Sequence, residues 1–254
     1  RGAAIQAIGV MGDEKQLADL VGLLQTSPSP RERADVEKAL LAISGRWGVV
    51  CVPALQTLMQ GNDAALRTVG LHGMAVAGGP EALAAVNAAL ADKDEAIQDE
   101  AARTLSTWPN NWPADEAAGE VLLTLARSDQ KMLHQVLGLR GYLQYVRGDK
   151  KLNNAAKVTK IRELLPLMQR PEEKRQAVGL LVGIRTAGAL ELLTTLAADP
   201  AVAEDACAAI VNLTARGLPG ASRQQRQKAL QTVVEKSKNG ATRKKAEEGL
   251  KEIP

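Results

Sequence analysis

The side chains best suited to acid–base or metal chemistry are scarce in this sequence of 254 residues, which has two histidines and two cysteines. A metal site needs several His, Cys or carboxylate ligands that converge on one point. Neither His72 nor His134 has a His, Cys or Asp three or four residues away, where a helix would place it on the same face. Cys51 and Cys207 stand among apolar residues, which favours buried free thiols over a disulfide. We therefore expect no metal site.

Catalytic and cofactor motifs are also absent from the sequence. A nucleophile needs a base within reach, and the chain has no GxSxG motif and only two histidines to act as bases. It also has no GxxxxGK[ST], GxGxxG, HExxH or CxxCH motif. Glu81, Glu95, Asp99 and Glu100 could supply paired carboxylates, but acids on repeat helices usually solvate a surface. The sequence predicts that the chain is not an enzyme and binds no cofactor.

The most unusual local motif is Trp108-Pro109-Asn110-Asn111-Trp112-Pro113, which we place in a loop between two helices. One interpretation is structural: Trp108 fills the seam between helices, and Trp112 packs against the start of the next helix. The other is functional, because exposed tryptophans beside amides offer a large contact area to a peptide or a sugar. Trp47, in Gly45-Arg46-Trp47-Gly48, is a weaker candidate of the same kind.

Charge is distributed unevenly along the chain, although the formal net charge is only +3. Residues 1–130 hold 10 Lys and Arg against 17 Asp and Glu, whereas residues 131–254 hold 22 against 12. Solvated helix faces that differ would explain this, and a polarised surface that orients a partner is the alternative. The basic clusters are Lys150, Lys151, Lys157, Lys160, Arg162, Arg223, Arg226, Lys228, Arg243, Lys244 and Lys245. They would suit nucleic-acid phosphates, but no aromatic residue for base stacking follows residue 150.

The elements that must position these residues are amphipathic helices. Over residues 94–108, Ile97, Ala101, Leu105 and Trp108 follow at steps of four, four and three, the rhythm of one helical face. The four-then-three spacing occurs eight times, at intervals of 29 to 40 residues, as in two-helix repeats. The eight stripes are Ala4, Ile8, Met11; Val36, Leu40, Ile43; Gly70, Met74, Ala77; Ala101, Leu105, Trp108; Leu139, Leu143, Val146; Ala177, Leu181, Ile184; Ala206, Ile210, Leu213; and Ala246, Leu250, Ile253. Because only 2% of residues are aromatic and Phe is absent, the core must be aliphatic, which suits closely packed helices.

Partner helices fill the intervals between the stripes, and turn residues separate them. We expect these helices at 13–25, 50–60, 80–90, 114–127, 154–169, 187–198 and 222–236. The prolines near expected helix starts are Pro30, Pro80, Pro113, Pro171 and Pro200. The acids directly before second helices, where they can cap the first turn, are Asp63, Asp94, Asp129 and Asp199. The glycines near helix ends are Gly12, Gly61, Gly78, Gly148 and Gly217. The longest connection, residues 147–153, is the candidate for a flexible joint.

The pattern resembles HEAT-type repeats over essentially the whole chain. In that family a first helix often carries proline beside leucine, as in Val52-Pro53-Ala54-Leu55 and Leu165-Pro166-Leu167. A second helix often opens with Asp, a small gap, an aliphatic residue and a basic one, as in Asp63-Ala64-Ala65-Leu66-Arg67; Asp94-Glu95-Ala96-Ile97-Gln98 departs at the basic residue. The resemblance implies an all-α, right-handed α-α superhelix (an armadillo-like solenoid) of about seven to eight helix pairs. It also implies a single domain over residues 1–254, similar to HEAT segments of larger bacterial multidomain proteins, and hence a fragment of a longer chain.

A HEAT-like fold implies that second helices line a concave wall. The expected inner row stands two residues after the start of each stripe and holds Lys38, His72, Arg103, Gly141, Gly179, Ala208 and Glu248. Small residues in the middle of this row would allow either close approach of a partner or tight curvature. The candidate partner-binding residues are Lys38, His72, Arg103, Trp108, Trp112, Arg140 and Arg175.

The function expected from these features is a non-enzymatic scaffold that binds a protein, or a neighbouring domain of the same polypeptide, along the concave face. The alternatives are nucleic-acid binding through the basic second half and a carbohydrate-contacting accessory module of a larger enzyme. We expect a soluble monomer, with no transmembrane segment because no apolar run reaches about 18 residues. The sequence leaves a cytoplasmic or periplasmic location open, and the fold by itself does not specify the function.

Overall fold

A computed structural model of the chain describes residues 1–27, 29–128, 131–215 and 218–253. These residues form fifteen α-helices and no strand, so the predicted all-α solenoid is confirmed. The helices are α1 Gly2–Met11, α2 Gln16–Thr26, α3 Pro30–Trp47, α4 Val52–Met59, α5 Ala64–Ala77, α6 Pro80–Ala88, α7 Glu95–Asn111, α8 Glu116–Arg127, α9 Met132–Gly148, α10 Asn154–Leu164, α11 Pro171–Val182, α12 Ala187–Leu196, α13 Ala203–Thr214, α14 Arg223–Lys236 and α15 Gly240–Lys251. Three short 3₁₀ turns join them: η1 Gly48–Cys51, η2 Ala89–Ala91 and η3 Leu165–Leu167.

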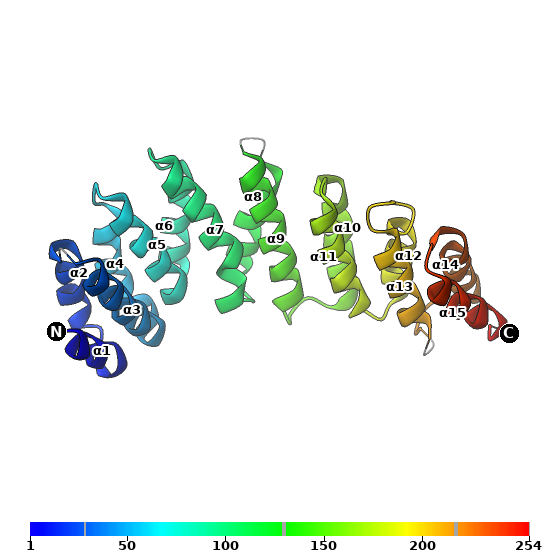
Figure 1. The fold of residues 1–254 in the computed structure, drawn as a ribbon, viewed down its shortest axis with the longest axis horizontal. Helices are drawn as coiled ribbons and strands as arrows, with labels where there is room; N and C mark the ends of the chain where they lie inside the picture. The colour runs from blue at the N-terminus through cyan, green and yellow to red at the C-terminus, as the bar shows by residue number, and fades with distance from the viewer. Residues whose placement is uncertain (28, 129–130, 216–217, 254) are drawn as a thin grey trace. The chain divides into compact units, whose positions relative to one another are not determined.

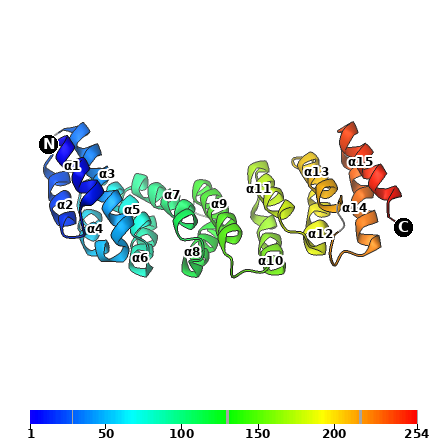
Figure 2. The ribbon, with the colours of Figure 1, turned by 90° about the horizontal axis from the view of Figure 1, so that it is seen from below.

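The chain divides into two compact units, unit 1 (residues 1–141) and unit 2 (residues 142–254). In unit 1 the first helices α2, α4, α6 and α8 form one layer, and the second helices α1, α3, α5 and α7 form the other (Figures 1 and 2). In unit 2, α10, α12 and α14 form one layer, and α11, α13 and α15 the other. Helices pack on their neighbours in sequence, as in a helical repeat array. The expectation of one domain over residues 1–254 stays a prediction.

The apolar stripes on the second helices form the core, as their spacing predicts. Six of the eight stripes are buried along their whole length, including Val36, Leu40 and Ile43 in α3. The exceptions are the first and last helices of the chain. In α1, Met11 is 80% exposed, and in α15 only Ala246 is buried. A stripe is therefore covered where another repeat packs against both sides of its helix, and is partly bare at either end of the array.

Side-chain caps explain where many of the helices begin. The residues that accept a hydrogen bond from the first turn are Ser29, Asp63, Asp94, Asp115, Asn153, Thr186, Ser222 and Asn239. Pro30, Pro80 and Pro171 occupy the first turn of their helices, where no N–H is needed. The predicted cap Asp199 instead accepts from the N–H of Ala201, because α13 starts only at Ala203. Two further predicted turn residues, Asp129 and Gly217, lie outside the described residues.

Helix α7 corrects the predicted position of the Trp-Pro motif. Trp108, Pro109, Asn110 and Asn111 lie inside α7, which ends at Asn111, and only the last two residues of the motif follow it. Pro109 lacks the N–H that would bond to the preceding turn, yet it is buried together with Trp108. Burial of these two side chains stabilises the helix, and it therefore continues past Pro109 although proline normally ends a helix.

The predicted joint, residues 147–153, is tied together around a buried acid. Asp149 is only 1% exposed, and its carboxylate accepts from the hydroxyl of Tyr145 at 3.1 Å and from the backbone N–H of Lys151 at 2.8 Å. Asn153 then caps α10. The connection between α9 and α10 is therefore a hydrogen-bonded turn.

One stretch, Pro30–Met59, is long and apolar enough to cross a membrane by length and composition alone. In the structure this stretch is α3, η1 and α4, and Gly48 interrupts it with a φ of 63°. Ile43 of α3 and Leu55 of α4 are fully buried within unit 1. Core helices of a packed protein have this same composition, so the stretch is weak evidence for a membrane span.

Candidate interaction surfaces

The second helices form the tighter layer of unit 1. Helix α1 packs extensively on α3, α3 on α5, and α5 on α7, whereas the first helices α2, α4, α6 and α8 touch one another far less. A stack of helix pairs curves toward the layer whose members lie closer together. The second helices of unit 1 therefore pack closely on one another, and their place on a concave face stays a prediction.

A line of charged side chains crosses the second-helix layer of unit 1. His72 of α5 lies between two carboxylates: its Nδ1 is 3.5 Å from Oε1 of Glu37 in α3, and its Nε2 is 2.9 Å from Oε1 of Glu100 in α7. The other oxygen of Glu100 accepts from Arg103 at 3.3 Å. The predicted row residues His72 and Arg103 thus come together through Glu100.

The ring of His72 on α5 connects the two neighbouring helices α3 and α7. Its two nitrogens face acids on opposite sides, so the three side chains do not converge on one point as metal ligands must. No group of three or more His, Cys, Asp or Glu residues with metal-site geometry occurs within the described ranges. His72 is partly exposed, with 36% of its side chain accessible, so this line of charges is also open to solvent or a partner.

The second histidine makes a similar but more buried link between α7 and α9. Nε2 of His134 lies 2.8 Å from Oδ1 of Asp99, and Nζ of Lys131 lies 3.2 Å from the same oxygen. Desolvation by burial would by itself raise the pKa of Asp99, but the hydrogen bonds from His134 and Lys131 outweigh it and hold this pKa below its usual value. Asp99 therefore serves as a charged tie between two helices and is a poor general acid.

The other basic residues predicted to bind a partner, Lys38, Arg140 and Arg175, differ in exposure and in pairing. Lys38 is exposed on α3, and Arg140 is partly buried on α9 with an interaction of its own. Arg175 of α11 is about half exposed and pairs with Asp205 of α13, with 3.2 Å between Nε and Oδ2. The structure thus joins Arg175 to the next second helix.

Both tryptophans of the Trp-Pro motif belong to the packing of unit 1. Trp108 is completely buried, and its Nε1 donates to Asp115 at 3.0 Å, so its side chain is a core group that presents no surface to a partner. Trp112 is partly buried, and its Nε1 donates to the carbonyl of Ala75 at 2.9 Å. Its ring lies against Gly78, in the preceding repeat. Trp112 therefore packs on the preceding repeat, and its packing against the start of the next helix stays a prediction.

The two cysteines are buried thiols. Both are fully inaccessible, and neither is in a disulfide. Burial raises the pKa of both, and in Cys207 the nearby charge of Glu204 adds to the effect and raises the pKa to about 11. A nucleophilic cysteine needs a lowered pKa and access to its substrate, and these residues have neither.

Two glycines of the predicted inner row have opposite surroundings. A Cβ at Gly141 would lie 2.9 Å from the Cα and 3.0 Å from the carbonyl oxygen of Ser106, so this glycine allows close helix packing. A Cβ at Gly179 would meet nothing within 4 Å, and the residue is exposed on α11. The small residue at Gly141 therefore allows helices to approach each other, whereas the one at Gly179 leaves space open.

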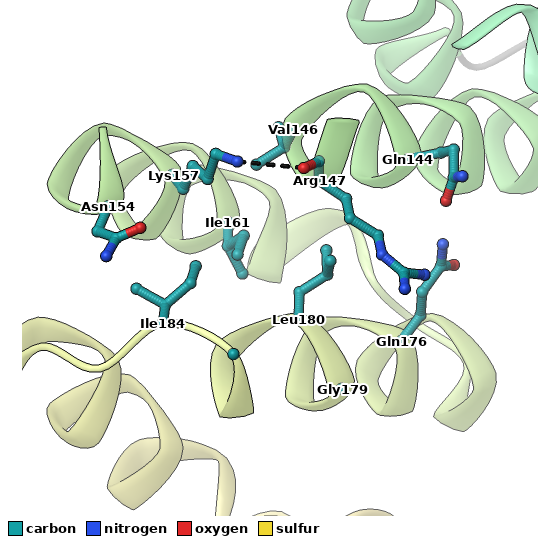
Figure 3. Close-up of a pocket in the computed structure, with 11 residues that line it drawn as sticks. Gln144, Val146, Arg147, Asn154, Lys157, Ile161, Gln176, Gly179, Leu180 and Ile184 are labelled. Atoms are coloured by element: carbon teal, nitrogen blue, oxygen red, sulfur yellow. Dashed lines mark hydrogen bonds between the residues drawn. The ribbon is translucent and has the colours of Figure 1, made fainter. Parts of the chain in front are cut away.

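The open space at Gly179 belongs to a groove within unit 2. It has a volume of about 480 Å³ and lies between the last turn of α9, helix α10 and helix α11. Its apolar lining is Val146, Ile161, Leu180 and Ile184, and its polar lining is Gln144, Arg147, Asn154, Lys157 and Gln176. Figure 3 shows Ile161, Leu180 and Ile184 facing one another, with Arg147 beside Gln176 at one side. This combination of an apolar floor and a few polar groups is typical of ligand sites of roughly 300–1,000 Å³.

Local structure positions the polar side of the groove. Arg147 lies in the last turn of α9, and its backbone carbonyl accepts from Nζ of Lys157 at 3.1 Å, which places a positive charge at the end of the helix (Figure 3). Lys160, one turn further along α10, donates to the hydroxyl of Tyr142 at 3.2 Å. These two contacts fix α10 against the end of α9.

Sequence reasoning found this groove only in part. Gly179 is in the predicted row and Lys157 in a basic cluster, but Gln144 and Gln176 were not singled out. The spacing between these residues follows no motif, because the groove depends on the positions of three helices. The cross-helix ion pairs do carry a sequence signal: Glu37 and His72, like Asp99 and His134, are 35 residues apart, about one repeat.

Comparisons with known proteins do not supply a family. No protein-family model and no curated protein matches the chain. Among solved structures, the chain is similar to the crystal structure of an engineered protein from the Northeast Structural Genomics Consortium. The identity is 19%, the match covers 94% of this chain and 96% of that chain, and the TM-score is 0.40. A similarity at this level carries no argument about relationship or activity.

Proposed function

We propose that this chain is a non-enzymatic scaffold of the HEAT-like kind, which binds a protein partner or a neighbouring domain through its second-helix layer. The groove at Gly179 is the observation that supports this most directly. It lies beside a second helix, has an apolar floor for side chains, and has amide groups that can pair with a peptide backbone. The line of charges at His72 provides a second polar surface on the same kind of helix in unit 1.

Nucleic-acid binding is the weaker alternative, because unit 2 has no exposed aromatic residue and some of its basic side chains are paired with carboxylates. Arg162 pairs with Glu191 at 3.2 Å, and Lys174 pairs with Asp199 at 2.5 Å. The aromatic residues of unit 2, Tyr142 and Tyr145, are buried and offer no face to a base.

A carbohydrate-contacting role at the Trp-Pro motif also has little support. Trp108 is inaccessible, and Nε1 of Trp112 already donates a hydrogen bond to the carbonyl of Ala75. A sugar would need an open aromatic face together with free polar groups. The motif is better explained as a tie between repeats.

Screening a library of extended peptides against the chain tests the scaffold proposal. Gly179→Leu should abolish binding of the selected peptides, because Gly179 lines the groove and an added Cβ there meets no atom within 4 Å, so the new side chain can occupy the groove. The matched control is Gly22→Leu in α2, also a helical glycine with nothing within 4 Å but away from the groove. Selected peptides that bind both variants equally well, or a library that yields no binder, would count against the groove as the binding site.

A further inference from the structure

The charge of the groove in unit 2 is one-sided. Two of its lining residues, Arg147 and Lys157, are cationic, and none is acidic. Its remaining polar residues are neutral amides. A site lined in this way attracts an anionic group, and its apolar walls strengthen that attraction by excluding water.

The guanidinium of Arg147 is the group best placed to receive an anion. Arg147 is exposed, and Figure 3 shows its side chain reaching along the groove toward Gln176. Within the part of the chain that the structure describes, no carboxylate lies within ion-pair distance of this guanidinium. The hydrogen bond from Lys157 goes to the backbone carbonyl of Arg147 and leaves the guanidinium unused. Among the described arginines of unit 2 outside the groove, Arg162, Arg170 and Arg175 pair with carboxylates, whereas Arg223, Arg226 and Arg243 have none within ion-pair distance.

The apolar lining of the groove indicates which kind of molecule would bring the anionic group to Arg147. Ile161 and Ile184 are buried aliphatic residues, and Leu180, which faces them, is partly exposed. The exposed part of Leu180 can contact an aliphatic side chain, and the exposed amide of Asn154 can both donate to and accept from a peptide backbone. A nucleic-acid strand would offer phosphates but no aliphatic group, and it would find no aromatic residue in the lining.

We propose that the groove binds an extended peptide segment in which a carboxylate side chain pairs with Arg147 and a nearby aliphatic side chain lies on Leu180. This inference rests on the proposed scaffold function and names the chemical class of the partner. Arginine suits the role because its planar guanidinium can form two parallel hydrogen bonds with one carboxylate.

Fluorescence polarisation with defined probes tests this assignment. The probes are fluorescein-labelled, C-terminally amidated peptides of alanine with one Leu and one Glu, separated by one, two or three residues, and the same peptides with Gln in place of Glu. We expect at least one Glu peptide to bind about tenfold more tightly than its Gln counterpart, the gain of one charge-assisted pair. Arg147→Gln should remove this difference. The control Arg162→Gln, which changes a paired arginine outside the groove, should leave it intact.

The possible outcomes separate this inference from the function on which it rests. Equal binding of Glu and Gln peptides, both blocked by Gly179→Leu, would overturn the acidic partner and keep the peptide scaffold. Absence of binding by these probes and by the peptide library would overturn both. Displacement of the Glu peptide by a labelled oligothymidine at low salt would overturn the peptide assignment in favour of nucleic acid. Circular dichroism of each variant confirms that the helices are intact.

Discussion

His134 and Asp99 form a buried link between α9 and α7, with 2.8 Å between Nε2 and Oδ1. The histidine side chain is 4% exposed and the carboxylate 28%. Lys131, directly before α9, donates to the same oxygen, so two donors at the start of this helix hold one acid of α7. Links of this kind join successive second helices, and their directional hydrogen bonds supplement the non-directional packing of the aliphatic core.

The lowered pKa of Asp99 predicts how this link depends on pH. A carboxyl group whose pKa is lower in the folded chain contributes stability above its ordinary pKa of about 3.9, and loses it as the pH falls through the lowered value. We expect Asp99→Asn to reduce the free energy of unfolding by about 1 kcal/mol near pH 6. The difference from the native chain should shrink below about pH 4, as measured by urea unfolding at a series of pH values.

Asp205→Asn provides the control for this measurement. Asp205 also pairs with a cation on a neighbouring helix, but both partners, Asp205 and Arg175, are about half exposed. Exposed pairs contribute little, so its effect should stay below about 0.5 kcal/mol at every pH. An Asp99→Asn variant as stable as the native chain near pH 6 would show that the link contributes nothing.

The ring of Trp112 lies where a side chain at Gly78 would have to be. A Cβ there would be 2.3 Å from Cε2 of Trp112, and Gly78 has a φ of 70° that L-residues rarely adopt. Gly78→Ala should therefore destabilise unit 1 in two ways, by about 1–3 kcal/mol for the backbone and by a similar amount for the overlap. In a Trp112→Ala background only the backbone part should remain.

A double-mutant cycle measured by urea unfolding separates these two contributions. We expect a coupling of at least about 1 kcal/mol between Gly78→Ala and Trp112→Ala, because the second change removes the overlap that the first creates. Additive effects within about 0.5 kcal/mol would mean that the Trp112 ring moves aside freely. That result would also leave the hydrogen bond from Trp112 to Ala75 with little importance.

The stripes were predictable because they depend on local geometry. Ala101 and Leu105 are four residues apart on one helix, and any helix with that spacing must bury the two side chains together or expose them together. The course of α7 past Pro109 was not predictable in this way. Proline ordinarily ends a helix, and only the burial of Trp108 beside it offsets that preference.

The candidate site was less predictable than the fold. The groove depends on the distance between α9 and α11, which no residue spacing encodes. Arg147 and Arg162 are both basic residues of one region, and only the structure shows that Glu191 pairs with the second. Charge pairs one repeat apart are the exception, since repeat length alone brings such residues onto neighbouring helices.

The buried thiols should react only when the chain opens. The pKa of Cys207, about 11, leaves very little thiolate near pH 8, and its side chain is inaccessible; Cys51 is equally buried. We expect no reaction of either thiol with an aromatic disulfide reagent in the native chain and reaction of both in concentrated guanidinium chloride. Ala208→Cys is the control, because Ala208 is exposed beside Cys207 and should react at once. Rapid labelling of the unmodified native chain would contradict the burial of these cysteines.

Gly141 and Gly179 occupy the same position in their stripes, and the same substitution should affect them in opposite directions. At Gly141 an added methyl group would lie about 3 Å from the backbone of Ser106, which cannot rotate away, so Gly141→Ala should cost about 1–3 kcal/mol. At Gly179 the methyl group meets nothing, and alanine restricts the unfolded chain and favours the helix, so Gly179→Ala should add about 0.5–1 kcal/mol. Urea unfolding of both variants measures the difference. Equal effects of one sign would mean that the helix packing around Gly141, or the open space at Gly179, is not as the structure has it.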